Sequence, residues 1–311
     1  MKKAENRRFF IRFFASILAT LLILASFVSC KEEDPEIRVP GGEDGEGPLE
    51  VHFIYVGQGD SELIITPTGD TILIDAGLPE AGLPEAGHKV VKYLQDVGVD
   101  DIDLFVASHY DGDHIGGSHS VFIEYEVHAV LMLDCDKNTS TAKRFKNDVS
   151  SEGSKIIYAE RGYEFSYGFV EFLVMSPEKI TDGGGNDDSI ILRMDYGEAR
   201  YLFTGDAEKK SERAALDFYS TEDLSSDVLK VGHHGSNTSS TADFLAAVSP
   251  DMAVISCGKG NSYGHPHAPT MNRLKVKVKA ENILRIDILG SVVIMTNGKD
   301  IYKAQEYSAR S

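Results

Sequence analysis

Three apolar segments of this chain each run into side chains that can bind a metal ion, and this arrangement constrains the fold more than any other feature. The candidate ligands that follow the segments are His109 to His114, Asp206, and His233 with His234. Short apolar segments bounded by Gly and Asp are typical of buried β-strands. Ligands far apart in the sequence can meet where strands end at one edge of a sheet. The chain is therefore expected to build a sheet core with its chemistry on the connecting loops.

The segment 108–117 carries four metal-binding side chains within six residues, at the spacing His-x-Asp-x-Asp-His. His109 and Asp111 are two residues apart and can point the same way from an extended segment. Asp113 and His114 come after the turn and can face a second point. The spacing predicts two neighbouring metal ions. The alternative is a solvated turn rich in Asp and Gly, which this density of ligands disfavours.

Composition limits the classes of function. The chain has 311 residues, of which 42% are hydrophobic and 26% are charged, as in ordinary globular proteins. Its formal net charge of -18 disfavours a surface that grips nucleic acid, because such a surface needs clustered Lys and Arg. The same charge is compatible with a metal-dependent enzyme, because bound ions supply positive charge locally.

The first thirty residues predict an export signal. A segment rich in Lys and Arg precedes the apolar run 13–28, which leads into Cys30. Cys30 stands where a bacterial lipobox has its lipidated Cys, so residues 1–30 are interpreted as a lipoprotein signal peptide. The alternative is a retained single-span anchor, for which the run is short. Both place the globular part in the cell envelope, tethered to a bacterial membrane and facing the periplasm or the exterior.

The remaining chain divides into a linker and one domain. Residues 31–48 are rich in acids, Pro and Gly, which cannot build a core, and predict a flexible linker. In 49–311 strand and helix patterns alternate without a second linker, which predicts a single α/β domain. The sequence Gly-Leu-Pro-Glu-Ala at 77–81 is repeated at 82–86 and is interpreted as a loop insertion near the site.

The expected elements of the domain are short. Strands are predicted at 51–56, 63–66, 71–75, 103–107, 127–133, 155–159, 170–175, 189–194, 201–204, 227–231 and 252–256. Helices are predicted at 88–97, 139–149, 207–219 and 240–248, and then from about 268, before two or three closing strands. Cys135 and Cys257 both follow strand-like runs and are expected to be unpaired thiols, with a disulfide as the alternative.

Six motifs occur along the domain. They are Val56-Gly-Gln-Gly-Asp60-Ser61, Ser108-His-x-Asp-x-Asp-His-Ile-Gly-Gly117, Asn186-Asp-x-Ser-Ile190, Phe203-Thr-Gly-Asp206, Leu229-Lys-Val-Gly-His-His-Gly-Ser236 and Asn261-x-Tyr-Gly-His-Pro266. Together they resemble the metallo-β-lactamase-fold hydrolases, in particular the branch that contains the hydrolase domain of ComEC-type competence proteins. The resemblance covers residues 50–305. It implies a four-layer αββα sandwich with the site along one edge of two packed sheets.

The resemblance also implies two divalent metal ions that share one carboxylate. The implied ligands are His109 and Asp111 for the first ion, Asp113 and His114 for the second, and Asp206 as the bridge. One histidine of the pair His233 and His234 is implied to complete the second ion, and His234 is the preferred one. Asp111 stands where many members of the wider fold carry His; because a carboxylate is a harder ligand, both Zn²⁺ and Mn²⁺ are candidates.

Other motif residues are candidates for catalytic, ligand or supporting roles. Asp113 and His265 are the candidate catalytic residues; His265 is either a proton donor or substrate contact, or a structural residue. Asn186 is either a further ligand or a residue that caps its loop. Asp60 is implied to hold a ligand histidine in place.

Two positions before the ligand motif leave questions open. Asp75, at the end of a predicted strand, can serve either as a ligand or as its support. Tyr55 occupies a position that is usually Asp in the branch, so the sequence departs from the pattern there.

The function implied is an extracytoplasmic dinuclear metal-dependent hydrolase. Phosphodiesters are the favoured substrates, because the branch includes nuclease-like and phosphorylcholine-esterase-like members, with metal-activated water as the nucleophile. The alternatives are a β-lactamase or lactonase, which Asp111 disfavours, and a catalytically degenerate surface binding protein, which Tyr55 favours.

The expected partners are a phosphodiester or other small-molecule substrate, and a membrane reached through the N-terminal lipid or anchor. A strong nucleic-acid-binding surface is not expected. ComEC-type proteins carry this domain beside a many-helix membrane channel, and this sequence has no further membrane span. A role in DNA uptake is therefore not implied.

Overall fold

The computed structural model describes residues 47–79 and 88–307. The strands are β1 (Leu49–Phe53), β2 (Glu62–Ile65), β3 (Thr71–Ile74), β4 (Ile102–Val106), β5 (Val127–Met132), β6 (Lys155–Tyr158), β7 (Glu164–Tyr167), β8 (Val170–Ser176), β9 (Ile191–Tyr196), β10 (Ala199–Phe203), β11 (Val228–Lys230), β12 (Met252–Ile255), β13 (Ile283–Arg285), β14 (Ser291–Thr296) and β15 (Ile301–Tyr307). The helices are α2 (Lys89–Val97), α3 (Gly112–Ile115), α4 (Ser118–Glu124), α5 (Ser140–Glu152), α6 (Lys209–Phe218), α7 (Thr221–Leu224), α8 (Ala242–Val248), α9 (Ala268–Lys277) and α10 (Ile286–Leu289), with short 3-10 turns η3 (Asn186–Asp188), η4 (Gly232–Gly235) and η5 (Ala280–Asn282). The predicted signal peptide, most of the linker and most of the duplicated segment lie outside the described residues.

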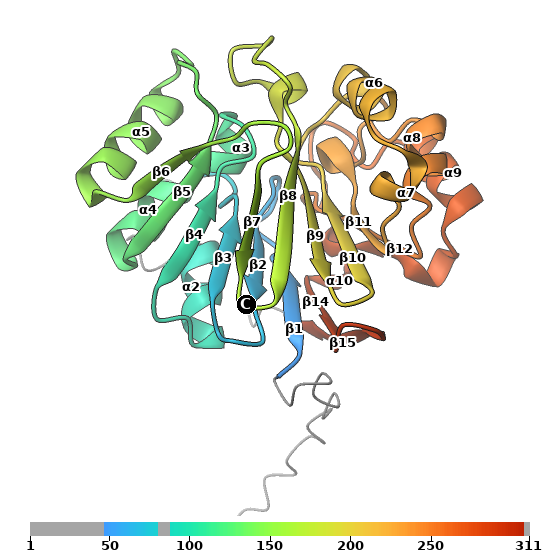
Figure 1. Cartoon of the computed structure of the whole chain (residues 1–311), viewed down its shortest axis with the longest axis horizontal. Helices are drawn as coiled ribbons and strands as arrows, with labels where there is room; N and C mark the ends of the chain where they lie inside the picture. Colours follow the sequence, from blue (N-terminus) through green and yellow to red (C-terminus); the bar gives the residue numbers. More distant parts are fainter. Residues whose placement is uncertain (1–46, 80–87, 308–311) are drawn as a thin grey trace, which may run out of the picture. The chain divides into compact units, whose positions relative to one another are not determined.

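Two mixed β-sheets pack against each other, with helices on their outer faces (Figure 1). Within the described ranges, the first sheet has eight strands in the order β15-β14-β1-β2-β3-β4-β5-β6, and the second has seven in the order β13-β12-β11-β10-β9-β8-β7. Helices α2, α4 and α5 lie over the first sheet, and α6, α8 and α9 lie over the second (Figure 1). The predicted αββα sandwich is confirmed.

Apolar side chains fill the layers on both sides of the sheets. Phe53 of β1 and Phe203 of β10 stack between the sheets, with ring centroids 6.3 Å apart. On the other face of the first sheet, Phe105 of β4 packs against Phe145 of α5, with ring centroids 5.8 Å apart. Because β4 is buried on both faces, it is a nearly continuous apolar run, as expected of a central strand with parallel neighbours.

The topology brings the ligand-bearing loops to one edge. Strand β3 pairs in parallel with β4, and β10, β11 and β12 pair in parallel with one another, so the carboxyl ends of the strands within each set lie together. Strand β2 is antiparallel to β3, so Asp60, just before β2, returns to the same edge. The loops after β4, β10 and β11 therefore lie at one edge, at the top of Figure 1. By their sequence positions, segment 108–117, Asp206 and the pair His233 and His234 belong to these loops.

Gly59 allows two of these loops to touch. Its φ is +139°, and a Cβ atom there would lie 2.3 Å from the carbonyl oxygen of Asp113. The backbone N–H of Asp60 donates to the same oxygen at 3.1 Å. Any side chain at position 59 would therefore push the Asp60 and Asp113 segments apart.

Most of the predicted core strands and helices are present, and the misses are short. Helices α3, α4, α7 and α10 and strand β7 were not predicted. Helix α3 is a single turn next to glycines, and β7 is an edge strand paired with β8 alone, so neither has a long apolar pattern to reveal it.

Two further expectations can be compared with the structure. Cys135 and Cys257 are free, as predicted. Among the helices of residues 47–79 and 88–307, none is long and apolar enough to cross a bilayer.

Candidate metal centre

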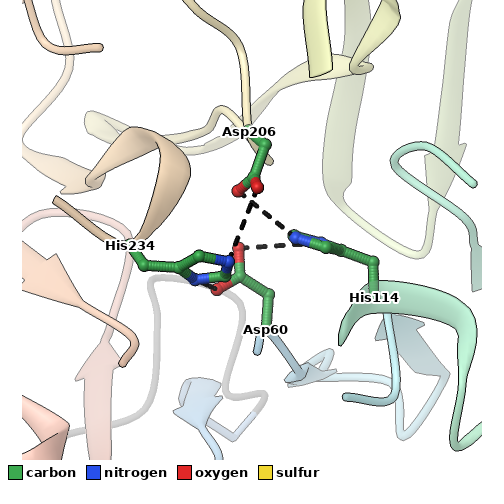
Figure 2. Close-up of side chains that lie close together, drawn as sticks. All are labelled: Asp60, His114, Asp206 and His234. Carbon is green, nitrogen blue, oxygen red and sulfur yellow. Dashed lines mark ion pairs between the residues drawn. The ribbon is translucent and has the colours of Figure 1, made fainter. Parts of the chain in front are cut away.

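One part of the site is a group of predicted ligands that face one another, of which His114, His234 and Asp206 are buried and Asp113 is partly exposed. We call Asp113, His114, His234 and Asp206 the inner half. His114 Nε2 lies 3.3 Å from Asp206 Oδ1. His234 Nε2 lies 3.1 Å from Asp113 Oδ2 and 3.5 Å from Asp206 Oδ2. These side chains come from α3, from the loop after β10 and from η4 after β11, and three of them are drawn in Figure 2.

Acceptor groups behind the two histidines fix their orientation. His114 Nδ1 lies 2.7 Å from Asp75 Oδ2. His234 Nδ1 lies 2.9 Å from the carbonyl oxygen of Ser256 and 3.1 Å from Asp60 Oδ1. Because carbonyl and carboxylate oxygens only accept, Nδ1 of each ring carries the proton and Nε2 faces the other ligands. The Ser256 carbonyl therefore accepts the hydrogen bond of His234, and Asp60 lies against the same nitrogen as an ion-pair partner whose Oδ1 has no hydrogen bond among the described residues.

A buried lysine stands behind Asp60. Lys230 Nζ lies 2.5 Å from Asp60 Oδ2, and both side chains are 1% exposed. Burial lowers the pKa of Lys230, but the charges of Asp60 and Glu62 outweigh it and raise the pKa above its ordinary value. Burial, followed by the charge of Asp60, raises the pKa of Glu62 well above its ordinary value. Lys230 therefore stays charged and balances Asp60.

The inner half is also strongly coupled electrostatically. Burial lowers the pKa of His234, but Asp206 and Asp60 outweigh it and raise that pKa to about 10. The pKa of His114 is raised well above its ordinary value because Asp206 and Asp75 outweigh burial. Burial raises the pKa of Asp206, but His234 and His114 hold it well below its usual range. Without a metal ion, the group is thus an array of imidazolium and carboxylate charges.

Several buried atoms of the site lack hydrogen bonds. His109 Nε2, His114 Nε2 and Asp206 Oδ1 make none among the described residues. A buried polar atom without a partner costs about 1–3 kcal/mol, so an array of such atoms calls for a ligand. Imidazole nitrogens and carboxylate oxygens suit Zn²⁺ and Mn²⁺. The residues present therefore fit a divalent cation, and Asp60, His114, Asp206 and His234 form a group close enough to hold one. Of the predicted ligands this group contains His114, Asp206 and His234, and it contains Asp60 in place of Asp113.

The other part of the site, which we call the outer half, consists of His109, Asp111 and His233. His109 is fully buried, and its Nδ1 lies 3.1 Å from Ser108 Oγ. Asp111 Oδ2 lies 3.6 Å from His109 Nε2, while Oδ1 accepts a hydrogen bond from Lys137. The Asp111 side chain is 36% exposed, so this half opens toward solvent.

The two adjacent histidines take different places. His233 and His234 have φ values of +47° and +54°, a conformation that costs non-glycine residues of order 1 kcal/mol and occurs at functional sites. His234 is buried beside Asp113. His233 is 21% exposed, with Nε2 3.7 Å from Asp206 Oδ2 and Nδ1 3.0 Å from Glu208 Oε1.

Asn186 lies beside the outer half. Its Nδ2 is 3.4 Å from Glu208 Oε1 and 3.5 Å from His233 Nδ1. The loop is capped instead by buried Asp188, which accepts hydrogen bonds from the backbone N–H groups of residues 181, 182 and 184. Asn186 is thus next to the ligands rather than the residue that closes its own loop.

His265 and Tyr55 also have defined surroundings. The His265 ring centroid lies 5.6 Å from that of His233 and 6.0 Å from that of His234. Burial, followed by the charges of His234 and His233, lowers the pKa of His265 to about 4, and its buried Nδ1 has no hydrogen-bond partner in the described structure. The hydroxyl of Tyr55 accepts a hydrogen bond from the backbone of Lys259 at 3.3 Å and adds no ligand to the cluster.

Four residues that matter here were not identified from the sequence: Glu62, Lys137, Glu208 and Lys230. Glu62 and Lys230 do leave a signal, because a charge inside an apolar strand segment is buried only if it is paired. Lys137 and Glu208 lie in polar loops, where nothing distinguishes them from solvated residues.

Comparison with known proteins places the chain. The sequence pattern of the metallo-beta-lactamase superfamily matches residues 54–259, which include every predicted ligand. The chain belongs to the metallo-β-lactamase superfamily. Members of this superfamily are metal-dependent hydrolases, usually with two ions, so the predicted superfamily and enzyme class are confirmed.

The curated relatives include competence proteins. The chain is 30% identical over 255 residues to ComE operon protein 3 of Bacillus subtilis, covering 78% of this chain and 32% of that protein. It is 35% identical over 272 residues to competence protein ComA of Neisseria gonorrhoeae, covering 88% and 34%. These superfamily relatives are of the ComEC type, as the motifs suggested, and the chain spans about a third of their length.

Solved structures support the fold. A mutant of the CmlA β-hydroxylase superposes with a TM-score of 0.53 at 13% identity, covering 80% of this chain and 54% of that one. YhfI from Bacillus subtilis, a metallo-β-lactamase-fold protein, gives 0.51 at 13% identity, covering 76% and 95%. At this identity the likeness concerns the fold alone.

Proposed function

We propose that this metallo-β-lactamase-superfamily hydrolase cleaves phosphodiesters with two divalent metal ions, Mn²⁺ or Zn²⁺. The observation that carries the proposal is the convergence of His114, His234 and Asp206, whose metal-binding atoms face one another in a buried space. The carboxylates of Asp111 and Asp113 make the ligand set rich in oxygen, which keeps Mn²⁺ beside Zn²⁺ as a candidate.

The two halves of the site divide the task of holding the ions. The inner half would hold one ion and the outer half the other, with Asp206 common to both. Such a pair of ions lowers the pKa of a water molecule and stabilises the negative charge that develops on phosphoryl oxygens. Asp75 and the Ser256 carbonyl keep the two inner imidazoles in the tautomer that presents Nε2.

His265 is the remaining group beside the ligands. With its lowered pKa of about 4 it is neutral at pH 7, so it can donate or accept one hydrogen bond at the substrate. Asp113 remains the second candidate catalytic residue; its carboxylate is paired with His234 in the metal-free chain.

The choice of phosphodiesters rests on the relatives. Their names refer to competence and recombination, processes that concern DNA, a polymer of phosphodiesters. The net charge of -18 disfavours a broad nucleic-acid grip, so a short or small phosphodiester suits this chain better than a long polymer.

We place the enzyme outside the cytoplasm, tethered to a bacterial membrane through Cys30. The support comes from the basic segment, the apolar run and Cys30 at its end. In cells fed labelled palmitate, the wild-type chain is expected to carry the label and Cys30→Ser is not. Equal labelling of both would exclude lipidation at Cys30.

The enzymatic proposal is tested by metal content and turnover. The full chain is expected to bind two equivalents of Mn²⁺ or Zn²⁺ and to hydrolyse a chromogenic phosphodiester. Asp113→Ala is expected to lose the inner ion and to reduce turnover by more than about a hundredfold. Removing a metal ligand should reduce activity by more than removing a residue that only orients a ligand does. Asp136→Ala is the matched control, since that carboxylate follows β5 with its side chain 99% exposed.

The possible failures are distinguishable. Two equivalents of metal without turnover of phosphodiesters would remove the substrate assignment and leave the metal site. Absence of stoichiometric metal would remove both. Metal without turnover of esters, β-lactams or lactones would indicate a binding protein.

A further inference from the structure

Lys137 makes a direct bond to a predicted metal ligand. Its Nζ donates to Asp111 Oδ1 and also to the carbonyl oxygen of Gly184, at 3.2 Å for the latter. The Lys137 side chain is 20% exposed, so the ammonium is largely withdrawn from water. Lys137 lies in the connection between β5 and α5 and was not identified from the sequence.

The second hydrogen-bond acceptor of Lys137, the Gly184 carbonyl, belongs to a loop that is fixed by several hydrogen bonds. Gly184 belongs to the loop between β8 and β9, at the top of Figure 1. Buried Asp188 accepts from the backbone N–H of Gly184 at 2.9 Å and from that of Asp182 at 2.8 Å. The N–H of Tyr110 donates to the Gly184 carbonyl at 2.9 Å, so the loop is joined to the ligand segment. The ammonium is therefore held in place by both of its acceptors.

Only one carboxylate oxygen of Asp111, Oδ2, is not bonded to Lys137. Oδ1 is bound to the ammonium, and Oδ2 points to the side of His109 Nε2, 3.6 Å away. That nitrogen is buried without a hydrogen-bond partner in the described structure. An ion held in the outer half would therefore share the carboxylate of Asp111 with a positive charge.

A lysine, Lys230, also lies behind the inner half, but it does not bond to a predicted metal ligand directly. Lys230 bonds to Asp60, and Asp60 in turn faces Nδ1 of His234, so a carboxylate and an imidazole separate that ammonium from the metal-binding nitrogen. In the outer half no group stands between Lys137 and the ligand. Two cations on one carboxylate repel each other, and repulsion is strong where water is partly excluded.

We propose that Lys137 weakens the outer ion selectively, so that the inner half binds metal tightly and the outer half binds it weakly and exchangeably. The inference rests on the proposed dinuclear site and states how that site is filled. Lys137 acts as a positioning residue through Asp111. The outer ion would be lost first on dilution or chelation, and activity would then follow free metal concentration.

The test is calorimetric titration of the metal-free full chain with MnCl₂, which needs no turnover. Wild type is expected to show a tight step and a weaker step. In Lys137→Met the weaker step is expected to tighten about tenfold or more, and the tight step to stay within about threefold. Lys137→Gln serves as a second neutral variant, and Lys137→Arg, which keeps the charge, is expected to resemble wild type.

Lys146→Met is the matched control. Lys146 lies on α5 and bonds Asp136 and the carbonyl of Cys135 rather than a ligand, so both steps should be unchanged. Circular dichroism and thermal unfolding confirm that each variant is folded.

Each other result has one meaning. A weaker or absent outer step in both neutral variants would show that Lys137 mainly orients Asp111, and would overturn the proposal. Two equally tight steps in wild type, or no change on substitution, would overturn it and leave the dinuclear site intact. Absence of any binding in wild type would overturn the proposed function as well.

Discussion

The inner and outer halves of the candidate metal centre each take two residues from the motif His109 to His114, yet they are supported in different ways. In the inner half, Asp75 lies 2.7 Å from Nδ1 of His114, and Asp60 lies 3.1 Å from Nδ1 of His234. Asp75 follows β3, Asp60 precedes β2, and Lys230 ends β11, so the support comes from both sheets. In the outer half the corresponding partners of Asp111 and His233 are Lys137 and Glu208, which lie on loops.

The difference shows that ligand identity alone does not set how a site is preorganised. Groups held by strands within a packed core are restrained by their neighbours, whereas loops tolerate rearrangement more easily. The inner half is therefore expected to keep its geometry with or without metal. The geometry of the outer half is expected to depend on whether Asp111 contacts a metal ion or the ammonium of Lys137.

The largest effect is expected from Asp206, which we propose to be common to both halves. Asp206→Asn removes the shared negative charge that faces His114 and His234, so both ion-binding steps should weaken and turnover should fall by more than about a hundredfold. Metal content after dialysis and hydrolysis of the chromogenic phosphodiester measure this. Asp136→Asn should behave as wild type. If Asp206→Asn lost one ion and kept the other unchanged, the carboxylate would not be shared.

The second expected effect concerns the support of the inner half. Asp60→Asn leaves Lys230 buried without its carboxylate and removes the charge beside His234, both at sites about 1% exposed. The free energy of unfolding should drop by about 3 kcal/mol or more, and inner-ion affinity by about 10–100-fold. Chemical denaturation and calorimetry measure the two quantities.

The matched change in the outer half is Glu208→Gln, which alters the partner of His233. Because His233 is partly exposed, its effects should be smaller than those of Asp60→Asn in both measurements. Equal losses in the two variants would mean that the halves are supported alike, and the comparison would fail.

The third prediction concerns the protons that the inner half releases when it binds a metal ion. His234, with its pKa raised to about 10, and His114, with its pKa also raised, are protonated at pH 7 when metal is absent. Metal binding needs Nε2 unprotonated, so filling the inner half releases protons and its affinity rises with pH between 6 and about 10. Each proton released contributes about tenfold per pH unit.

Calorimetry at pH 7 in two buffers of different ionisation enthalpy gives the number of protons released. The tight step should release close to two protons in wild type and one fewer in His234→Gln. A tight step that releases none would show that the carboxylates do not hold these imidazoles in their charged form.

The comparison also explains what the sequence could predict. The ligand motif is local: the spacing from His109 to His114 and the strand before it predict a metal site without knowledge of the fold. The shared edge was predictable from strand ends, because parallel strands carry their following loops to one side. The fold followed from the alternation of strands and helices together with the resemblance of six motifs.

The supporting residues could not be predicted in the same way. Lys230 and Lys137 have the same side-chain chemistry, but Lys230 pairs with Asp60, 170 positions away, and Lys137 pairs with Asp111, 26 positions away. Which of the two lysines contacts a predicted ligand therefore depends on the tertiary fold. Short elements such as β7 have too few residues to show a period. Loop contacts such as Lys137 with Gly184 depend on tertiary packing, and the local sequence carries no sign of them.

The smallest effect is expected at Asn186, and it sharpens the description of the outer half. Its amide lies 3.4 Å from Glu208 and 3.5 Å from His233, near the limit of hydrogen bonding, so it contributes little to either. Asn186→Ala should change outer-ion affinity by less than about tenfold, below the range for residues that support a ligand directly, and leave the inner step unchanged. Asn186→Asp adds a carboxylate at the same place and should tighten the outer step. Loss of a whole metal equivalent in Asn186→Ala would instead make Asn186 a ligand, and the outer half would then be held by a loop residue as strongly as the inner half is held by the sheets.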